Sequence, residues 1–147
     1  MNKSKPPILL YVIIGLLVVA IATGAIYSAV AEPSFGSGYD DHPKVMNFSD
    51  IDEMGQDGTE MIYRFHPQCG ACVRIKGEVL DFANNNEPGV EVYMTHIDYE
   101  ENLPAGLYRG TPSLLVVENG TIVKEVTGAT DIPAFFEDVN DGTYEVE

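Results

Sequence analysis

Residues 65–72 read Phe-His-Pro-Gln-Cys-Gly-Ala-Cys and contain the only two cysteines of the 147-residue chain. The apolar run 61–65 before Pro67 is typical of a buried strand. After the cysteines, apolar residues recur with the spacing of one helical face, at positions 72, 75, 79, 80, 82 and 83. Three consecutive asparagines end that pattern. The sequence therefore predicts that Cys69 and Cys72 lie at a strand-to-helix junction.

This placement suits the two cysteines for thiol–disulfide exchange. Cys69 falls at the cap of the predicted helix, where free backbone N–H groups and the helix dipole favour a thiolate. Cys72 lies one turn further on, within bonding reach and more buried. His66 could add a positive charge that stabilises the thiolate, or it could be a solvent-facing loop residue. We expect Cys69 to be the reactive thiol and Cys72 to resolve its mixed disulfides.

The Cys-x-x-Cys spacing of this pair is also that of half a zinc site. A structural tetrahedral site needs two further ligands, and no other cysteine is available. The remaining candidates are His42, His66 and His96, none of which shows the paired spacing of a zinc finger. A metal-binding role for the pair stays open as an alternative.

The rest of the chain predicts an α/β domain with a mixed central sheet flanked by helices. A β–α–β unit is followed by a hairpin at Asn119-Gly120, a dipeptide that favours tight turns, and then by a closing helix. Four strands are predicted, at 61–65, 90–97, 113–117 and 121–127. Three helices are predicted: a short one capped by Asn47 or Ser49 and ending at residue 54, one from the cysteines to about 84, and a last one from its cap Asp131 to about 139.

Four segments in this order resemble the thioredoxin family over about residues 45–139. They are F-H-P-Q-C-G-A-C after a strand, Ile97-Asp98 at the end of the next strand, Y-R-G-T-P-S-L-L-V-V-E-N-G before a hairpin, and V-T-G-A before the last helix. The resemblance implies a thioredoxin fold, as in thioredoxin-like and protein disulfide-isomerase-like domains. It also implies a protein disulfide oxidoreductase whose catalytic residues are Cys69 and Cys72.

The resemblance further assigns residues that shape the site. Pro112 corresponds to a cis-proline that lies against the active-site disulfide, and Thr111 before it presents its backbone to the incoming substrate cysteine. Gly70 and Ala71 separate the two cysteines. No cofactor or metal is implied besides the redox-active Cys69–Cys72 disulfide.

Several positions depart from the family. Thioredoxins carry a buried acid where this chain has Tyr63, and a neighbouring lysine where it has Met94. Phe65 and Gln68 replace the tryptophans around the motif, and Gly77 replaces a helix proline. The resemblance therefore indicates exchange chemistry, while oxidant, reductant and isomerase roles all stay open.

The N-terminal part of the chain predicts export. Residues 8–31 contain no charged side chain and follow Lys3 and Lys5, and about 20 apolar residues suffice to cross a bilayer. We expect a cytoplasmic arm at 1–7, a transmembrane anchor at 8–31, and an extracytoplasmic domain. The alternative is a signal peptide cleaved after Ala31. A linker at 32–44, the domain at 45–140 and an acidic tail at 141–147 complete the predicted organisation.

The charge of the exported part limits its partners. Residues 32–147 contain all 23 acidic residues of the chain but only six basic ones, which gives them a formal charge of −17. Such a surface argues against nucleic acid or anionic lipid as a partner. We expect protein thiols or disulfides as substrates and a further partner that recycles the cysteine pair. A non-catalytic binding module and a metallochaperone are the alternatives, and Asn47 and Asn119 match the N-glycosylation pattern.

Overall fold

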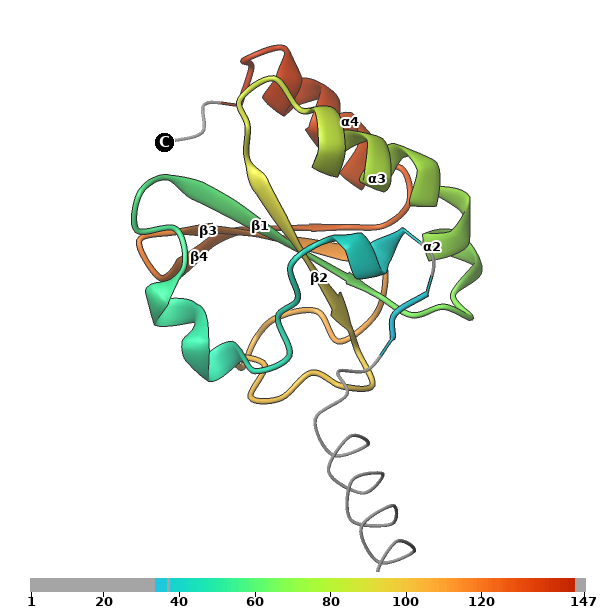
Figure 1. Cartoon of the computed structure of the whole chain (residues 1–147), viewed down its shortest axis with the longest axis vertical. Coiled ribbons are helices and arrows are strands. Elements are labelled where there is room, and N and C mark those ends of the chain that lie inside the picture. The colour runs from blue at the N-terminus through green and yellow to red at the C-terminus, as the bar shows by residue number, and fades with distance from the viewer. Residues whose placement is uncertain (1–33, 37, 145–147) are drawn as a thin grey trace, which may run out of the picture. The chain divides into compact units, whose positions relative to one another are not determined.

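The computed structural model describes residues 34–36 and 38–144, and its centre is the strand that precedes the cysteines (Figure 1). This strand, β1 (Thr59–Phe65), lies between β2 (Glu91–His96) and β3 (Ser113–Glu118), and β4 (Thr121–Thr127) completes the order β2-β1-β3-β4. β1 and β2 are parallel, whereas β3 is antiparallel to both β1 and β4. The predicted mixed sheet and its four strands are confirmed.

Helices cover the sheet where the apolar patterns place them. α3 (Lys76–Asn85) and α4 (Asp131–Asn140) lie side by side (Figure 1), and the rings of Phe82 and Phe136 stack with centroids 4.1 Å apart. α2 (Gly70–Arg74) precedes α3, and the short helices η1 (Tyr39–Asp41) and η2 (Phe48–Glu53) precede β1. The side chain of Asn47 caps η2, as predicted.

Two details of the helices differ from the prediction. The helix from the cysteines to residue 84 is divided at Ile75, whose φ of −99° and ψ of 9° leave the α-helical region. The N-cap of α4 is Thr130 rather than Asp131, and the Thr130 side chain makes no capping hydrogen bond. Asp131 instead occupies the first turn, where its negative charge suits the helix dipole.

β1 is buried on both faces of the sheet. Met61, Tyr63 and Phe65 point into one apolar cluster, which α3 and α4 also line. Ile62 points into a second cluster on the other face, together with residues of η2 such as Phe48. A strand fixed from both sides holds the residues at its end, including those that lead to Cys69, in a defined position.

The predicted linker differs from the structure at its C-terminal part. Phe35 and Tyr39 are only 3% and 5% exposed, and the Tyr39 and Phe65 rings lie 4.1 Å apart. The Gly/Ser/Pro-rich composition predicted a solvated segment, but its two aromatic side chains cover apolar surface beside the end of β1. Phe35, Tyr39 and the stretch 38–44 therefore fall within the compact unit that begins at Phe35, ten residues before the predicted start of the domain at residue 45.

The predicted acidic tail contacts the domain at Tyr144, the last residue that the structure describes. The Tyr144 ring meets the Phe135 ring edge-on at 4.9 Å, and its backbone N–H donates to Asp138 O.

The arm predicted at 1–7 and the apolar segment at 8–31 lie outside the described residues. In the part of the chain that is described, no helix has both the length and the apolar character that a bilayer crossing requires.

Stability distinguishes a linker residue from a core residue at position 39. Truncating a side chain in a solvated linker leaves the free energy of unfolding unchanged, whereas truncating an aromatic side chain in the core lowers it by about 3 kcal/mol. We predict that Tyr39→Ala lowers the free energy of unfolding of the full chain by about that amount, measured by urea denaturation followed by circular dichroism. Tyr108→Ala is the matched control, because that ring is 50% exposed. Equal stability of the two variants would contradict the assignment of the Tyr39 side chain to the core.

Candidate active site

Cys69 occupies the N-cap of α2, directly after the turn that follows β1. Its Sγ accepts a hydrogen bond from the Cys72 backbone N–H at 3.2 Å, and its thiol donates to Thr111 O at 3.5 Å. Cys69 is partly exposed, whereas Cys72 is buried, and both are free thiols. One sulfur is therefore accessible to another molecule and the second lies behind it, as the sequence predicted.

The surroundings move the two thiol pKa values in opposite directions. Burial alone raises the pKa of Cys69, but hydrogen bonds with the side chains of Cys72 and Thr111 and with the backbone of Cys72 and Ala71 outweigh it and lower the pKa below its ordinary value. For Cys72, burial and the hydrogen bond with the Cys69 side chain raise the pKa. A low thiol pKa at the exposed position favours Cys69 over Cys72 as a nucleophile.

The loop before β3 lies against Cys69. The Thr111-Pro112 peptide bond is cis, as the family resemblance implies, and Pro112 O accepts the backbone N–H of Gly128 at 3.0 Å. Thr111 O is the acceptor for the Cys69 thiol. The structure thus brings Thr111 and Pro112 to the cysteine pair from 39 residues further along the chain. Gly70, also assigned to the site, begins α2, and a Cβ there would meet nothing within 4 Å.

His66 contacts the cysteine pair through its backbone. Its carbonyl accepts the Cys69 N–H at 3.0 Å, and its ring lies against Asp98 and His96, with Nε2 3.3 Å from the Asp98 carboxylate. Because the Asp98 carboxylate lies close to the ring, its negative charge counteracts the effect that a positive charge on His66 would have on Cys69. Among the described residues, no direct contact between the His66 ring and Cys69 supports the predicted electrostatic role of His66.

His66, His96 and Asp98 are also the one group in the described residues whose donor atoms, all within 4.8 Å of one another, could hold a metal ion. Each imidazole, however, accepts a backbone N–H at Nδ1, from Gln68 and Asp98 respectively, both at 3.1 Å. A neutral ring arranged in this way carries its proton on Nε2, the atom that a metal would need. Metal binding would require both hydrogen bonds to break, so this arrangement does not favour it.

Comparison with known proteins identifies the fold. No family model and no curated protein sequence matches the chain. Among solved structures, thioredoxin from Fasciola hepatica superposes with a TM-score of 0.56 at 19% identity, over 67% of this chain and 97% of that one. A mutant thioredoxin from Halobacterium salinarum gives 0.55 at 22% identity, over 78% and 100%. Oxidised mitochondrial thioredoxin 3 from Saccharomyces cerevisiae gives 0.54 at 17% identity, over 71% and 99%.

The chain has the thioredoxin fold. At these identities the likeness establishes the architecture alone, so the chemistry must be argued from the residues of this chain.

One residue that positions the site of this thioredoxin fold escaped the sequence-based prediction. Arg64 is completely buried on β1. Its guanidinium donates to both Glu100 oxygens at 2.9 and 2.7 Å, to Tyr108 O at 2.6 Å and to Ser113 Oγ at 2.8 Å. These bonds tie the loop that carries Thr111 to the central strand. The sequence did contain a signal for this role: Arg64 is the only charged residue in the apolar run Met-Ile-Tyr-Arg-Phe, and a charged residue within a buried strand needs a partner.

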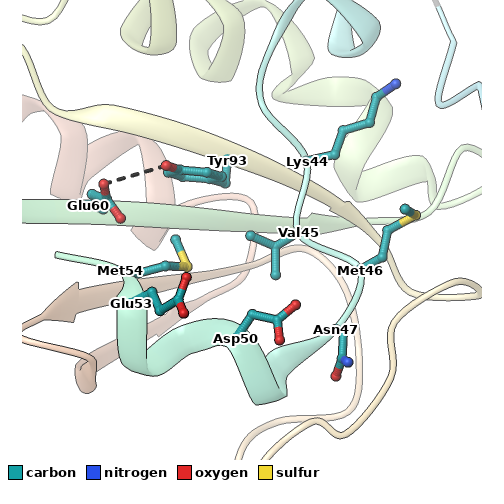
Figure 2. Close-up of a pocket in the computed structure, with 9 residues that line it drawn as sticks. All are labelled: Lys44, Val45, Met46, Asn47, Asp50, Glu53, Met54, Glu60 and Tyr93. Carbon is teal, nitrogen blue, oxygen red and sulfur yellow. Dashed lines mark hydrogen bonds between the residues drawn. The ribbon is translucent and has the colours of Figure 1, made fainter. Parts of the chain in front are cut away.

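Among the cavities formed by the described residues, one adjoins the cysteines. A cavity of about 220 Å³ has Cys72, Val73, Phe65 and Tyr39 among its lining residues. A second cavity, of about 330 Å³, lies between η2 and the edge of the sheet. Figure 2 shows its acidic side chains, including Asp50 and Glu53, with Lys44 pointing away from them. Its lining residues include no cysteine and no histidine, so only the first cavity could serve chemistry at the cysteine pair.

Removing one partner of the buried Arg64–Glu100 pair should be costly, because the remaining charge is left unpaired away from water. We predict that Arg64→Leu lowers the free energy of unfolding by about 3 kcal/mol, and that adding Glu100→Leu restores part of the loss. Arg74→Leu, at an exposed position on α2, is the control for losing a positive charge. A double variant less stable than Arg64→Leu would show that the pair is not coupled in this way.

The opposite pKa shifts predict an order of thiol reactivity. As the pH is raised, Cys69 should become reactive toward iodoacetamide at a lower pH than Cys72, because only the thiolate is alkylated. Mass spectrometry of peptides from the reduced full chain, sampled over time at several pH values, measures both rates. Identical pH profiles for the two cysteines would contradict this assignment of the nucleophile.

Proposed function

We propose that the chain is a thiol–disulfide oxidoreductase that acts on protein thiols and disulfides through Cys69 and Cys72. The observation that carries the proposal is the asymmetry of the pair. Cys69 is partly exposed with a lowered pKa, and Cys72 is buried one turn behind it with a raised pKa. The thioredoxin fold of the chain supports the same chemistry, since its structural neighbours include thioredoxins.

The geometry suggests how exchange would proceed. The Cys69 thiolate attacks one sulfur of a substrate disulfide, and the other substrate sulfur leaves as a thiolate. Cys72 then attacks Cys69, the Cys69–Cys72 disulfide forms, and the second substrate sulfur is released. The substrate gains two electrons and the cysteine pair loses them, so a separate thiol partner must reduce the pair again. The reverse sequence oxidises a substrate dithiol.

The backbone of Thr111 is placed to hold the substrate during this reaction. Thr111 O faces the Cys69 thiol, and it is the atom beside which an incoming sulfur would lie. The buried Arg64 network keeps the loop of Thr111 on the central strand, which limits how far this oxygen can move. Substrate recognition through backbone atoms suits an enzyme that accepts many protein sequences.

The location of the reaction follows from the N-terminal sequence. We place the domain outside the cytoplasm, tethered by a transmembrane helix at residues 8–31, or released if the chain is cleaved after Ala31. Disulfide chemistry of proteins is concentrated in such compartments. The direction of exchange follows from the reduction potential: a value near about −270 mV assigns a reductase and one near about −120 mV an oxidant.

Trapping of a mixed disulfide tests the proposal. Cys72→Ser should accumulate covalent adducts between the full chain and protein substrates, because Cys69 can still attack but nothing resolves the product. The adducts should disappear with dithiothreitol on non-reducing gels, and Cys69→Ser should form none. If Cys72→Ser forms no adduct, and the unchanged chain neither reduces insulin disulfides nor oxidises the thiols of reduced insulin, the chain is a non-catalytic binding module on this fold.

A further inference from the structure

Tyr63 carries a polar group that contributes nothing to the packing of the core. The side chain is fully buried on β1, and its hydroxyl has no hydrogen-bond partner among the described residues. Burying a hydroxyl without a partner is unfavourable, and phenylalanine would fill the same space without that penalty. A stability argument alone therefore predicts Phe at position 63, and the oxygen requires another explanation.

The neighbours of this hydroxyl suggest one. The Tyr63 ring stacks on Phe65 and lies 6.1 Å from the Tyr39 ring. The ionisable groups that act on its oxygen are the Tyr39 phenol and the Cys72 thiol, although neither makes a hydrogen bond of ordinary geometry with it. Tyr39 and Cys72 also line the same cavity. Tyr63 and Cys72 belong to the same apolar cluster, so the hydroxyl and the second thiol are neighbours in the core.

The phenol at this position remains protonated. Burial, and then the nearby Tyr39 and Cys72, raise the pKa of Tyr63 above its ordinary value. A group that does not give up its proton cannot serve as a base, but it is a permanent hydrogen-bond donor. Because it keeps its proton, the Tyr63 hydroxyl can donate a hydrogen bond to an acceptor that forms next to it.

Such an acceptor forms when Cys72 reacts. Cys72 is 2% exposed and burial raises its thiol pKa, so its thiolate is poorly solvated. The backbone N–H of His66 lowers this pKa and is one compensating donor. A thiolate in an apolar site benefits strongly from each added donor, because charge-assisted hydrogen bonds are stronger than neutral ones.

We propose that the Tyr63 hydroxyl donates a hydrogen bond to the Cys72 thiolate while Cys72 resolves the mixed disulfide on Cys69. This inference rests on the proposed oxidoreductase function. In the step, the Cys72 thiol releases its proton to solvent and the thiolate attacks Cys69. The Cys69–Cys72 bond forms, the Cys69–substrate bond breaks, and the substrate sulfur leaves as a thiolate that takes up a proton from water. Tyr63 keeps its own proton throughout.

Other titratable groups face Cys72 and must be considered in any pH profile. Cys69 lies in the preceding turn, Tyr39 projects from η1, and His66 and Lys76 line the adjoining cavity. Lys76 Nζ lies 4.8 Å from the centre of the Tyr39 ring. These groups are the same in chains with Tyr or Phe at position 63, so a difference between the two reports the hydroxyl.

The test isolates Cys72 in a Cys69→Ser full chain and replaces Tyr63 by Phe. Thiolate absorbance as a function of pH should show the Cys72 titration displaced upward by about one unit in Tyr63→Phe, which is about tenfold less thiolate at a given pH. The urea midpoint should be unchanged or higher, because an unpartnered hydroxyl has been removed. A purely structural role for the hydroxyl would instead lower the midpoint and leave the titration in place.

Tyr93→Phe is the matched control. Tyr93 belongs to the opposite face of the sheet, where its hydroxyl donates to Glu91 at 3.0 Å, so the Cys72 titration should not move. With both cysteines present, Tyr63→Phe should also slow the release of a trapped substrate about tenfold.

The outcomes separate this inference from the proposed function. If exchange proceeds and the Cys72 titration is the same with Tyr and Phe, the role of Tyr63 is wrong and the oxidoreductase stands. If the titration shifts but no exchange occurs, the contact is real and the oxidoreductase proposal fails.

Discussion

The burial of β1 on both faces is the constraint on which the rest of the structure depends. A strand with apolar residues packed above and below cannot shift its register without exposing one set, so each residue it carries has a fixed place. Arg64 and Tyr63 are neighbours in sequence but lie on opposite faces. Arg64 holds the loop of Thr111 from one side of the sheet, and Tyr63 lies in the same apolar cluster as Cys72 on the other. The two halves of the site are thus aligned by one strand.

The site also shows how an acidic domain can favour a thiolate. Acidic groups outnumber basic ones in residues 32–147, and Cys69 gains its lowered pKa from local hydrogen bonds, not from neighbouring positive charges. Hydrogen bonds from backbone N–H groups act at short range and are little affected by the net charge or by salt. The reactivity of Cys69 is therefore separated from the charge of the surface, which leaves the surface free to serve solubility.

The sequence predicted the sheet well because its signals are local. The apolar run before Pro67, the helical spacing after Cys72 and the turn at Asn119-Gly120 each determine structure within a few residues. What it did not predict depends on distant contacts. Phe35 and Tyr39 sit in a stretch with the composition of a linker, and only the end of β1, some 25 residues on, explains their burial. Arg64 looked like an ordinary basic residue because its partner Glu100 lies in a loop without a regular pattern. The pairing of Cys69 with Thr111-Pro112 was reached through the family resemblance, since spacing alone cannot join them.

The aromatic side chains of Phe35 and Tyr39 have a consequence for how the cysteine pair could be regulated. Both line the cavity beside Cys72, although they come from the stretch that precedes η2 in the chain. Any event that displaces these two rings would open the apolar surroundings of the buried sulfur to water without touching either cysteine. In the oxidoreductase proposed above, the packing of Phe35 and Tyr39 would therefore control how well the second thiol is solvated.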